Sequence, residues 1–387
     1  MKKRVVKILH IFKYAGYALT FMLCVLLVLS AYGGHIDPYQ STVFALATLG
    51  FPIVLIVSTT LAIAWLIVGH WRIALLVLVA LVLSWPTLGI VSPLNTSSHT
   101  YTPQEDSTKF KVLTYNVMNF NVMKTGDDNL HNKKGQSTVK YILDQDADVV
   151  LLQEASLAAD FNDLRLIKPY LQQIKKKYPY RDHGYHDQVI WSKHPYTALE
   201  DPAIKDGFAS PDDPVNSYHF YARGFDVLVP GHTVRFINVH LQSIGLSEED
   251  RQAFVNITEG KGINTKQELR KVRYSLLGKL GEAFRKHADQ AKLLRQVLDQ
   301  SDENVIICGD FNDTPASWAY RVIAGNDLRD AWVDCGFGPT YTYHDNRLFF
   351  KIDHVLYRGD MKATETRRDR TGGSDHYPLV TTFVWKN

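Results

Sequence analysis

The sequence predicts an α/β protein in which a two-sheet sandwich flanked by helices follows three transmembrane helices. Three long apolar runs without a charged residue lie within the first 91 of 387 residues. After them, short runs rich in Val, Ile, Phe and Tyr alternate with stretches of helical periodicity, which is typical of layered α/β domains. With 45% hydrophobic and 21% charged residues, the composition excludes a disordered or collagen-like chain.

The apolar runs cover approximately residues 14–33, 41–69 and 73–91. Each reaches the ~20 residues that a helix needs to cross ~30 Å of hydrocarbon. They lack the alternation of barrel strands, and a cleaved signal peptide would account for the first run alone. We therefore predict that residues 1–94 form a membrane anchor. Trp85 and Pro86, inside the third run, mark either the membrane interface or a kink.

The distribution of basic residues predicts the orientation of this anchor. The tail before the first run holds five basic residues and no acid, and Arg72 lies between the second and third runs. Because Lys and Arg favour the cytoplasmic side, three crossings place the rest of the chain outside the cytoplasm. The sequence thus predicts a multi-pass protein of the cell (inner) membrane with a cytoplasmic N-terminus. Residues 95–108 are polar and rich in turn formers, and we expect a linker there.

Charge and cysteine content narrow the function of the remaining chain. The whole chain has 43 Lys and Arg against 40 Asp and Glu, but residues 96–387 hold 37 basic and 39 acidic residues. This near-neutral balance gives no support to a generic nucleic-acid binder. The three cysteines imply no disulfide framework.

Residues 109–387 contain the elements of the predicted sandwich. We expect helices at 135–144 and at about 266–299, the second with an interruption around Gly278 and Gly281. Residues 244–287 have the character of an insertion, and the sequence does not indicate their role. The expected strands span 110–117, 147–154, 188–192, 225–230, 233–241, 304–311, 350–357 and 379–385.

Polar residues stand at the ends of several of these strands. Glu154 and Asp310 directly follow strongly apolar runs, where carboxylates seldom lie without a partner. Because strand ends that share a sheet edge lie close together, and binding sites form at such edges, we expect one shared site. The full set is Asn116, Glu154, Asn238, His240, Asp310, Asn312, Asp353, His354, Asp375 and His376.

These residue types favour one kind of chemistry. Asn, Glu and Asp supply hard oxygen ligands, which suit Mg²⁺ or Mn²⁺, and no Cys/His spacing indicates zinc. Histidine and asparagine donate hydrogen bonds to a phosphoryl group whose negative charge grows during reaction, and an Asp can deprotonate water. Together they predict hydrolysis of a phosphate ester.

In their order and context, the segments TYNV, LLQE, NVH, GDFN, KIDH and GSDH resemble the endonuclease/exonuclease/phosphatase superfamily, which has the deoxyribonuclease I-like fold. The resemblance extends over residues 109–385 and implies a two-sheet sandwich with metal-dependent phosphoesterase activity. It also implies that Glu154 is the principal metal ligand, with Asn116 and Asp375 close by in the metal site.

The same resemblance implies roles for five further residues. Asp310 orients or deprotonates the attacking water, while His240 and Asn312 contact the phosphate. His376 binds the phosphate or assists proton transfer. Asp353 orients the His376 ring by accepting its other N–H, which fixes the tautomer and raises the basicity of the imidazole.

The substrate of this chemistry stays open at the level of sequence. A phospholipid or sphingolipid head group is our first hypothesis, because an anchor raises the effective concentration of the enzyme at the bilayer. An extracytoplasmic nuclease is the alternative, with the basic clusters 175–177, 270–273 and 367–370 as candidate contacts to a phosphate backbone. A non-catalytic membrane-bound module is a third possibility, which the intact acidic residues oppose. No obligate protein partner is evident.

Overall fold

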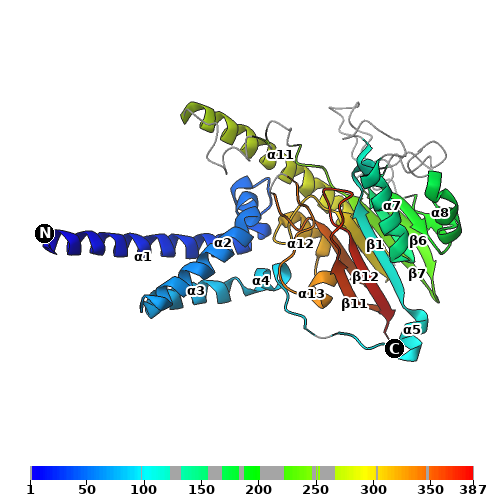
Figure 1. Cartoon of the computed structure of the whole chain (residues 1–387), viewed down its shortest axis with the longest axis horizontal. Helices are drawn as coiled ribbons and strands as arrows, with labels where there is room; N and C mark the ends of the chain where they lie inside the picture. The colour runs from blue at the N-terminus through cyan, green and yellow to red at the C-terminus, as the bar shows by residue number, and fades with distance from the viewer. Residues whose placement is uncertain are drawn as a thin grey trace.

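The computed structural model describes residues 2–96, 98–122, 132–155, 168–182, 187–200, 222–245, 250, 252, 266–301, 304–345 and 348–386. A group of helices projects from one end of a layered α/β domain, and the N-terminus lies at the far tip of that group (Figure 1). The projecting helices are α1 (Lys2–Tyr32), α2 (Thr42–Ile67), α3 (Trp71–Leu83) and α4 (Trp85–Val91).

Two of these helices are long and apolar enough to cross a membrane, and the bent pair α3–α4 makes a third if it counts as one span. The third predicted run is therefore not a straight helix, because α3 and α4 meet at an angle of 70°. Pro86 stands in the first turn of α4, and its ring removes the N–H that would continue the hydrogen bonding of α3. Trp85 and Pro86 were expected to mark either the membrane interface or a kink, and the structure confirms a kink at these residues.

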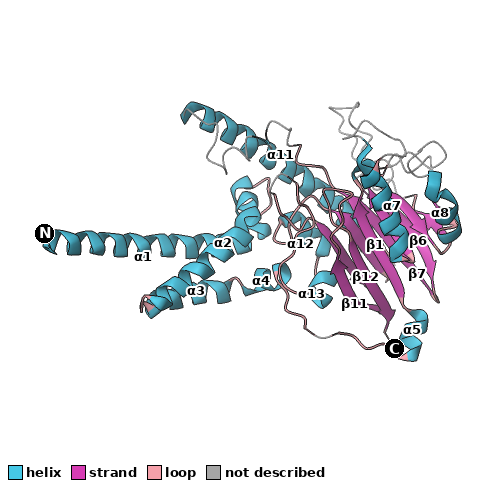
Figure 2. Ribbon diagram, viewed as in Figure 1, coloured by secondary structure: helices cyan, strands magenta, loops and turns pink. Residues whose placement is uncertain are grey.

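Two six-stranded sheets form the domain (Figure 2). The first has the order β11-β12-β1-β2-β4-β3 and the second β5-β6-β7-β8-β10-β9. Each sheet has one parallel pair at its centre, β1–β2 and β7–β8, flanked by antiparallel strands. The strands of the first sheet are β1 (Phe110–Asn116), β2 (Val149–Gln153), β3 (Tyr180–Arg181), β4 (Val189–Ser192), β11 (Met361–Arg368) and β12 (Leu379–Trp385). Those of the second are β5 (Tyr196–Ala198), β6 (Ala222–Val229), β7 (His232–His240), β8 (Val305–Asp310), β9 (Arg329–Asp330) and β10 (Asp353–Arg358).

Every strand expected from the sequence is present, and the two-sheet sandwich is confirmed. The longest strand that the sequence did not indicate is β11, an edge strand with the polar sequence MKATETRR. Its apolar residues are few because one face of an edge strand remains in contact with water, so the hydrophobic pattern is weak.

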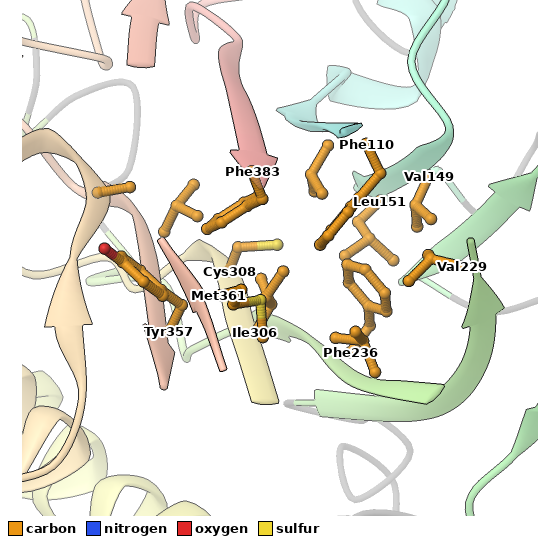
Figure 3. Packing of buried hydrophobic residues seen from close by; sticks show 14 of the residues in the cluster. Phe110, Val149, Leu151, Val229, Phe236, Ile306, Cys308, Tyr357, Met361 and Phe383 are labelled. Atoms are coloured by element: carbon orange, nitrogen blue, oxygen red, sulfur yellow. The ribbon is translucent and has the colours of Figure 1, made fainter. Parts of the chain in front are cut away.

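The main core lies between the sheets. Phe110, Leu151 and Phe383 of the first sheet pack toward Phe236 and Ile306 of the second (Figure 3). Helices α7 (Lys133–Gln145) and α8 (Leu171–Lys177) cover the outer face of the first sheet, and α11 (Lys266–Asp299) and α12 (Trp318–Ala324) that of the second. The remaining described helices are η1 (Gly33–His35), α5 (Pro103–Thr108), η2 (Met118–Asn121), η4 (Lys168–Tyr170) and α13 (Ala331–Cys335).

Helix α11 runs without a break through Gly278 and Gly281, so the interruption expected there is absent. Gly281 is buried where α11 crosses the start of α2, and a Cβ at this position would lie 3.3 Å from Cγ2 of Thr42. The glycine thus allows a close approach between the two helices rather than ending one of them.

Polar contacts join the projecting helices to the domain. Tyr39 donates a hydrogen bond to Asp289 of α11 at 2.5 Å, and Lys292 pairs with Asp37 at 3.1 Å. Arg321 of α12 donates to Thr87 of α4 at 3.1 Å. The segment expected as a linker contains α5, which begins with a capping box of Thr102 and Glu105.

Candidate active site

The central parallel strands end beside one another, and their terminal side chains meet between the sheets. Asn116 ends β1, and its side-chain amide donates to Glu154 Oε1 and to Asp310 Oδ2, each at 3.0 Å. Glu154 directly follows β2, and Asp310 ends β8 of the other sheet. Asn116 is fully buried and so connects the polar ends of the two sheets.

Local backbone geometry turns these side chains toward a common space. Glu154 and Asn312 have φ angles of 47° and 48°, a left-handed conformation that side chains rarely adopt. Gly309 has a φ angle of 138°, and a Cβ there would lie 2.0 Å from the carbonyl oxygen of Val239. Only glycine therefore fits this position in GDFN. The strained residues cluster at the strand ends, which is typical of functional sites.

Asp310, Asp353 and His376 form a buried group. His376 Nδ1 lies 2.9 Å from Asp353 Oδ2, and its Nε2 lies 3.5 Å from Asp310 Oδ2. Burial lowers the pKa of the His376 imidazole, but the negative charges of Asp353 and Asp310 have the larger effect and raise it to about 10. Burial also raises the pKa of Asp310 to about 6, while the adjacent His376 lowers it.

A second histidine–carboxylate pair faces Asp310 from the other side. His240 Nδ1 lies 2.5 Å from Asp187 Oδ2, and His240 Nε2 lies 3.8 Å from Asp310 Oδ2. Burial opposes the charge, but Asp187 raises the pKa of His240 to about 10. The raised pKa values favour the protonated imidazoles, in which both ring nitrogens can donate hydrogen bonds. Sequence reasoning did not identify Asp187, whose only signal is an acid placed just before β4.

Asn312 and its neighbours hold the GDFN loop. The Asn312 backbone N–H donates to Asp310 Oδ1 at 2.8 Å, and its side-chain amide donates to the Leu241 carbonyl at 2.9 Å. His287 of α11 lies 3.3 Å from Asp313 Oδ2 through its Nδ1. This contact joins α11 to the loop, and neither His287 nor Asp313 was indicated by the sequence pattern.

Two of the polar residues noted at strand positions have structural partners instead. Asn238 is fully buried, accepts from Gln153 at 2.6 Å and donates to the Leu152 carbonyl at 2.9 Å, so it joins β7 to β2. His354 is also fully buried, and its Nδ1 lies 2.9 Å from Lys351 Nζ.

The strand ends open into one cavity of about 400 Å³. Asn116 and Asp353 are not part of its lining and support it through the hydrogen bonds above. The predicted site residues that do line it are Glu154, His240, Asp310, Asn312, Asp375 and His376.

The donor set of this site fits a hard divalent cation. Glu154, Asp310 and Asp375 contribute carboxylates to one cavity, and such a concentration of negative charge favours a bound cation. Asp310, Asp353 and His376 place one potential ligand atom each within 4.8 Å of one another. Protonated His376 is not a metal ligand, however, and its Nδ1 already contacts Asp353. The oxygen ligands therefore fit the cation better than a set that includes His376.

Comparison with known proteins agrees with this geometry. The model of the Endonuclease/Exonuclease/phosphatase family matches residues 113–376, and that of a domain of unknown function matches residues 9–91. A search of curated proteins finds no match.

Several solved structures are similar to the chain at low identity. A protein of the same family from Bacteroides thetaiotaomicron is 17% identical, with a TM-score of 0.45 over 74% of this chain and 100% of that one. Truncated TDP2 of Caenorhabditis elegans is 16% identical, with a TM-score of 0.43 over 72% and 98%. A mannosyl-6-phosphatase of Bacteroides thetaiotaomicron is 16% identical, with a TM-score of 0.44 over 71% and 100%. Since the family model spans most of the domain and its motifs meet at one cavity, the chain belongs to the endonuclease/exonuclease/phosphatase family of divalent-metal-dependent phosphoric ester hydrolases.

Proposed function

We propose that this protein is a membrane-anchored phosphoesterase that hydrolyses a phosphodiester or phosphomonoester outside the cytoplasm with Mg²⁺ or Mn²⁺. The observation that carries the proposal is the meeting of carboxylates, the Asn312 amide and two carboxylate-paired histidines in a single cavity. This combination binds a cation and a phosphate together and supplies a base for water.

We assign the metal to the first sheet. Glu154 is the principal ligand, with Asn116 and Asp375 beside it. A divalent cation bound there would polarise a phosphoryl oxygen and offset its growing charge. The hydrogen bond from Asn116 to Glu154 orients the carboxylate that holds the cation.

We assign the proton transfers and the phosphate contacts to the second sheet and to His376. Asp310, ionised above its pKa of about 6, takes a proton from the water whose oxygen attacks phosphorus. His240 and Asn312 donate hydrogen bonds to the phosphoryl oxygens. His376 donates to the phosphate or protonates the departing oxygen as the P–O bond breaks. Asp353 fixes the His376 ring by accepting its Nδ1–H.

A lipid head group suits this protein better than a nucleic acid. Of the basic clusters that favoured a nuclease, Lys177 pairs with Asp146 at 3.1 Å and Arg367 pairs with Asp369. Paired cations contribute less to binding a phosphate backbone than free ones. The side chains of the cluster 270–273 lie outside the described residues. A substrate in the bilayer also benefits from an enzyme held at its surface.

The placement of the anchor supports an extracytoplasmic domain. The turn between α1 and α2 contacts the domain through Tyr39 and Asp37, whereas the basic N-terminal tail lies at the opposite end of α1 (Figure 1). A helix that spans the bilayer has its ends on opposite sides, and basic tails favour the cytoplasm. A reporter fused after Asn387 should be active only if it functions outside the cytoplasm. Activity confined to cytoplasmic reporters would contradict this orientation.

The function can be tested with purified full-length protein in detergent. We would assay it with Mg²⁺ or Mn²⁺ against p-nitrophenyl phosphate, bis(p-nitrophenyl) phosphate, sphingomyelin, phosphoinositides and plasmid DNA. We expect metal-dependent hydrolysis of a lipid and of at least one simple ester, and no activity in excess chelator. Cleavage of DNA alone would favour the nuclease, and inactivity on every ester would overturn the proposal.

A further inference from the structure

The cavity that holds the catalytic residues has two unlike ends. Glu154, Asp310, Asp375 and both histidines lie at the end where the strands finish. The other end is mostly apolar, and its walls come from α2, from α11 and from the segment that precedes β10. Asp250, which also lines the cavity, pairs with Lys279 of α11. The apolar lining residues are Leu46, Leu49, Ile53, Leu276, Leu280, Phe284, Leu348, Phe350 and Ile352. A simple water-soluble phosphate ester would leave this apolar end unused.

The first apolar wall belongs to a helix that is suited to crossing the membrane. Leu46, Leu49, Gly50 and Ile53 follow the spacing of one helical face, and they fall within roughly the first three turns of α2. From Leu46 to Ile53 this face extends about 10 Å along the helix axis. Ile53 is 64% exposed and belongs to the segment Thr42–Ile67, which is long and apolar enough to cross a membrane. The cavity therefore continues along α2 from the catalytic residues into the apolar part of the anchor.

The facing wall is the middle of α11. Leu276, Leu280 and Phe284 recur every four residues and so lie along one side of this helix. Gly281 brings α11 close to Thr42, and the Tyr39–Asp289 and Lys292–Asp37 contacts fix the same crossing. These residues belong partly to 244–287, the insertion-like region whose role the sequence left open. Its described helical part closes the side of the cavity opposite α2.

From this arrangement we infer that the substrate is an amphiphilic phosphate ester with a long hydrocarbon chain, which lies between α2 and α11 while its phosphate lies among the catalytic residues. This inference rests on the proposed phosphoesterase function. The chain would enter laterally from the bilayer, because the apolar end of the cavity is built on a membrane helix. The anchor is then part of the substrate site and more than a tether. A volume of about 400 Å³ falls within the usual range of small-ligand pockets, ~300–1,000 Å³.

The test compares esters that differ only in chain length. Full-length protein in vesicles is assayed with p-nitrophenyl hexadecyl phosphate and p-nitrophenyl ethyl phosphate, and with hexadecyl and ethyl phosphate as the corresponding monoesters. We expect the ratio of kcat/KM for the long and short ester to be at least 100, about 2.8 kcal/mol, since each buried methylene favours binding. Partition of the long ester into vesicles also raises this ratio, so variants of the protein must separate the two effects.

Leu49→Trp and Ile53→Trp place a bulky side chain in the apolar end of the cavity. In either variant the long-to-short ratio should fall at least tenfold, while hydrolysis of the ethyl ester remains measurable and shows that the protein is folded. Ile63→Trp is the matched control, because Ile63 is an exposed α2 residue outside the cavity lining. This control should keep the wild-type ratio.

The possible failures are distinguishable. If the wild type does not prefer the long ester, the proposed hydrocarbon-chain site is wrong. The same holds if the cavity variants have the same long-to-short ratio as Ile63→Trp. Neither result contradicts the proposed phosphoesterase function. If the wild type hydrolyses neither ester with Mg²⁺ or Mn²⁺, the proposed function itself fails. Cleavage of plasmid DNA with no activity on the long esters would assign the site to a nucleic acid and overturn the inference.

Discussion

The two sheets have the same plan but supply different parts of the site. In each, a central parallel pair is flanked by antiparallel strands, and polar residues follow the ends of that pair. The first sheet presents Glu154, which we propose as the principal metal ligand, and Asn116, whose side-chain amide donates to Glu154. The second presents His240 and Asp310, to which we assign a phosphate contact and the deprotonation of water. Under the assignment proposed above, the two sheets supply different parts of the reaction, the first the cation site and the second the base for water.

This division predicts that variants of the first sheet change the metal requirement, whereas variants of the second change turnover at saturating metal.

Glu154→Gln should show the largest effect. The substitution keeps the shape of the side chain but removes the charge that holds the cation, and the loss of metal catalysis amounts to several kcal/mol. We expect activity to fall at least roughly 10³-fold, with partial recovery at high Mg²⁺ or Mn²⁺. A metal titration of kcat/KM measures this. Near-normal activity, or wild-type activity in excess chelator, would remove Glu154 from its role.

Asp310→Asn should cause the second largest loss of activity. Asparagine can still accept the hydrogen bond from the Asn312 N–H, but it cannot take a proton from water. General bases typically contribute about 10²–10⁴-fold to a rate, so we expect a loss of that order in kcat. The half-saturating metal concentration should change much less than in Glu154→Gln. If the two variants have the same metal titration, the sheets do not divide the work as proposed.

The sequence indicated more of the polar residues that line the cavity than of their partners. Glu154 and Asp310 could be found because a carboxylate directly after an apolar strand is conspicuous. Asp187 could not, because it lies far along the chain from His240 and only the β4–β2–β7 arrangement brings the two together. Partners that meet through the fold leave no local pattern.

Prediction of the fold from the sequence also fails where structure depends on contacts between distant segments. Buried strands such as β8 have apolar runs that identify them, but the edge strand β11 is half exposed and polar. Gly281 suggested a break in α11, since glycine lowers helix propensity by about 1 kcal/mol relative to alanine. The packing of α11 on α2 outweighs that preference, and the sequence of α11 alone does not indicate that it packs on α2. Likewise, the apolar end of the cavity could not be predicted, because two distant helices build it.

The pair of Asp353 and His376 tests whether side chains of different elements act as one unit. Asp353→Asn removes the charge that stabilises the protonated ring, and we expect a loss of roughly 10–100-fold in kcat with the metal requirement unchanged. A double-mutant cycle with His376→Ala measures the coupling. The double variant should lose little more than His376→Ala alone, because residues that act as a unit are not additive. Strictly additive losses would show that Asp353 does not act through His376.

Asp187→Asn should give the smallest loss, and it separates the two histidine–carboxylate pairs. Asp187 supports His240 as Asp353 supports His376, but the side chain of Asp187 is 29% exposed against 2% for Asp353. Water can therefore replace part of the interaction at His240, whereas it has little access to His376. We expect a loss below about tenfold in kcat, smaller than for Asp353→Asn, since exposed charge pairs are typically worth less than about 1 kcal/mol. Steady-state kinetics of both variants on the same ester give the comparison directly. A loss in Asp187→Asn that equals or exceeds that in Asp353→Asn would mean that His240 contributes more to the reaction than His376.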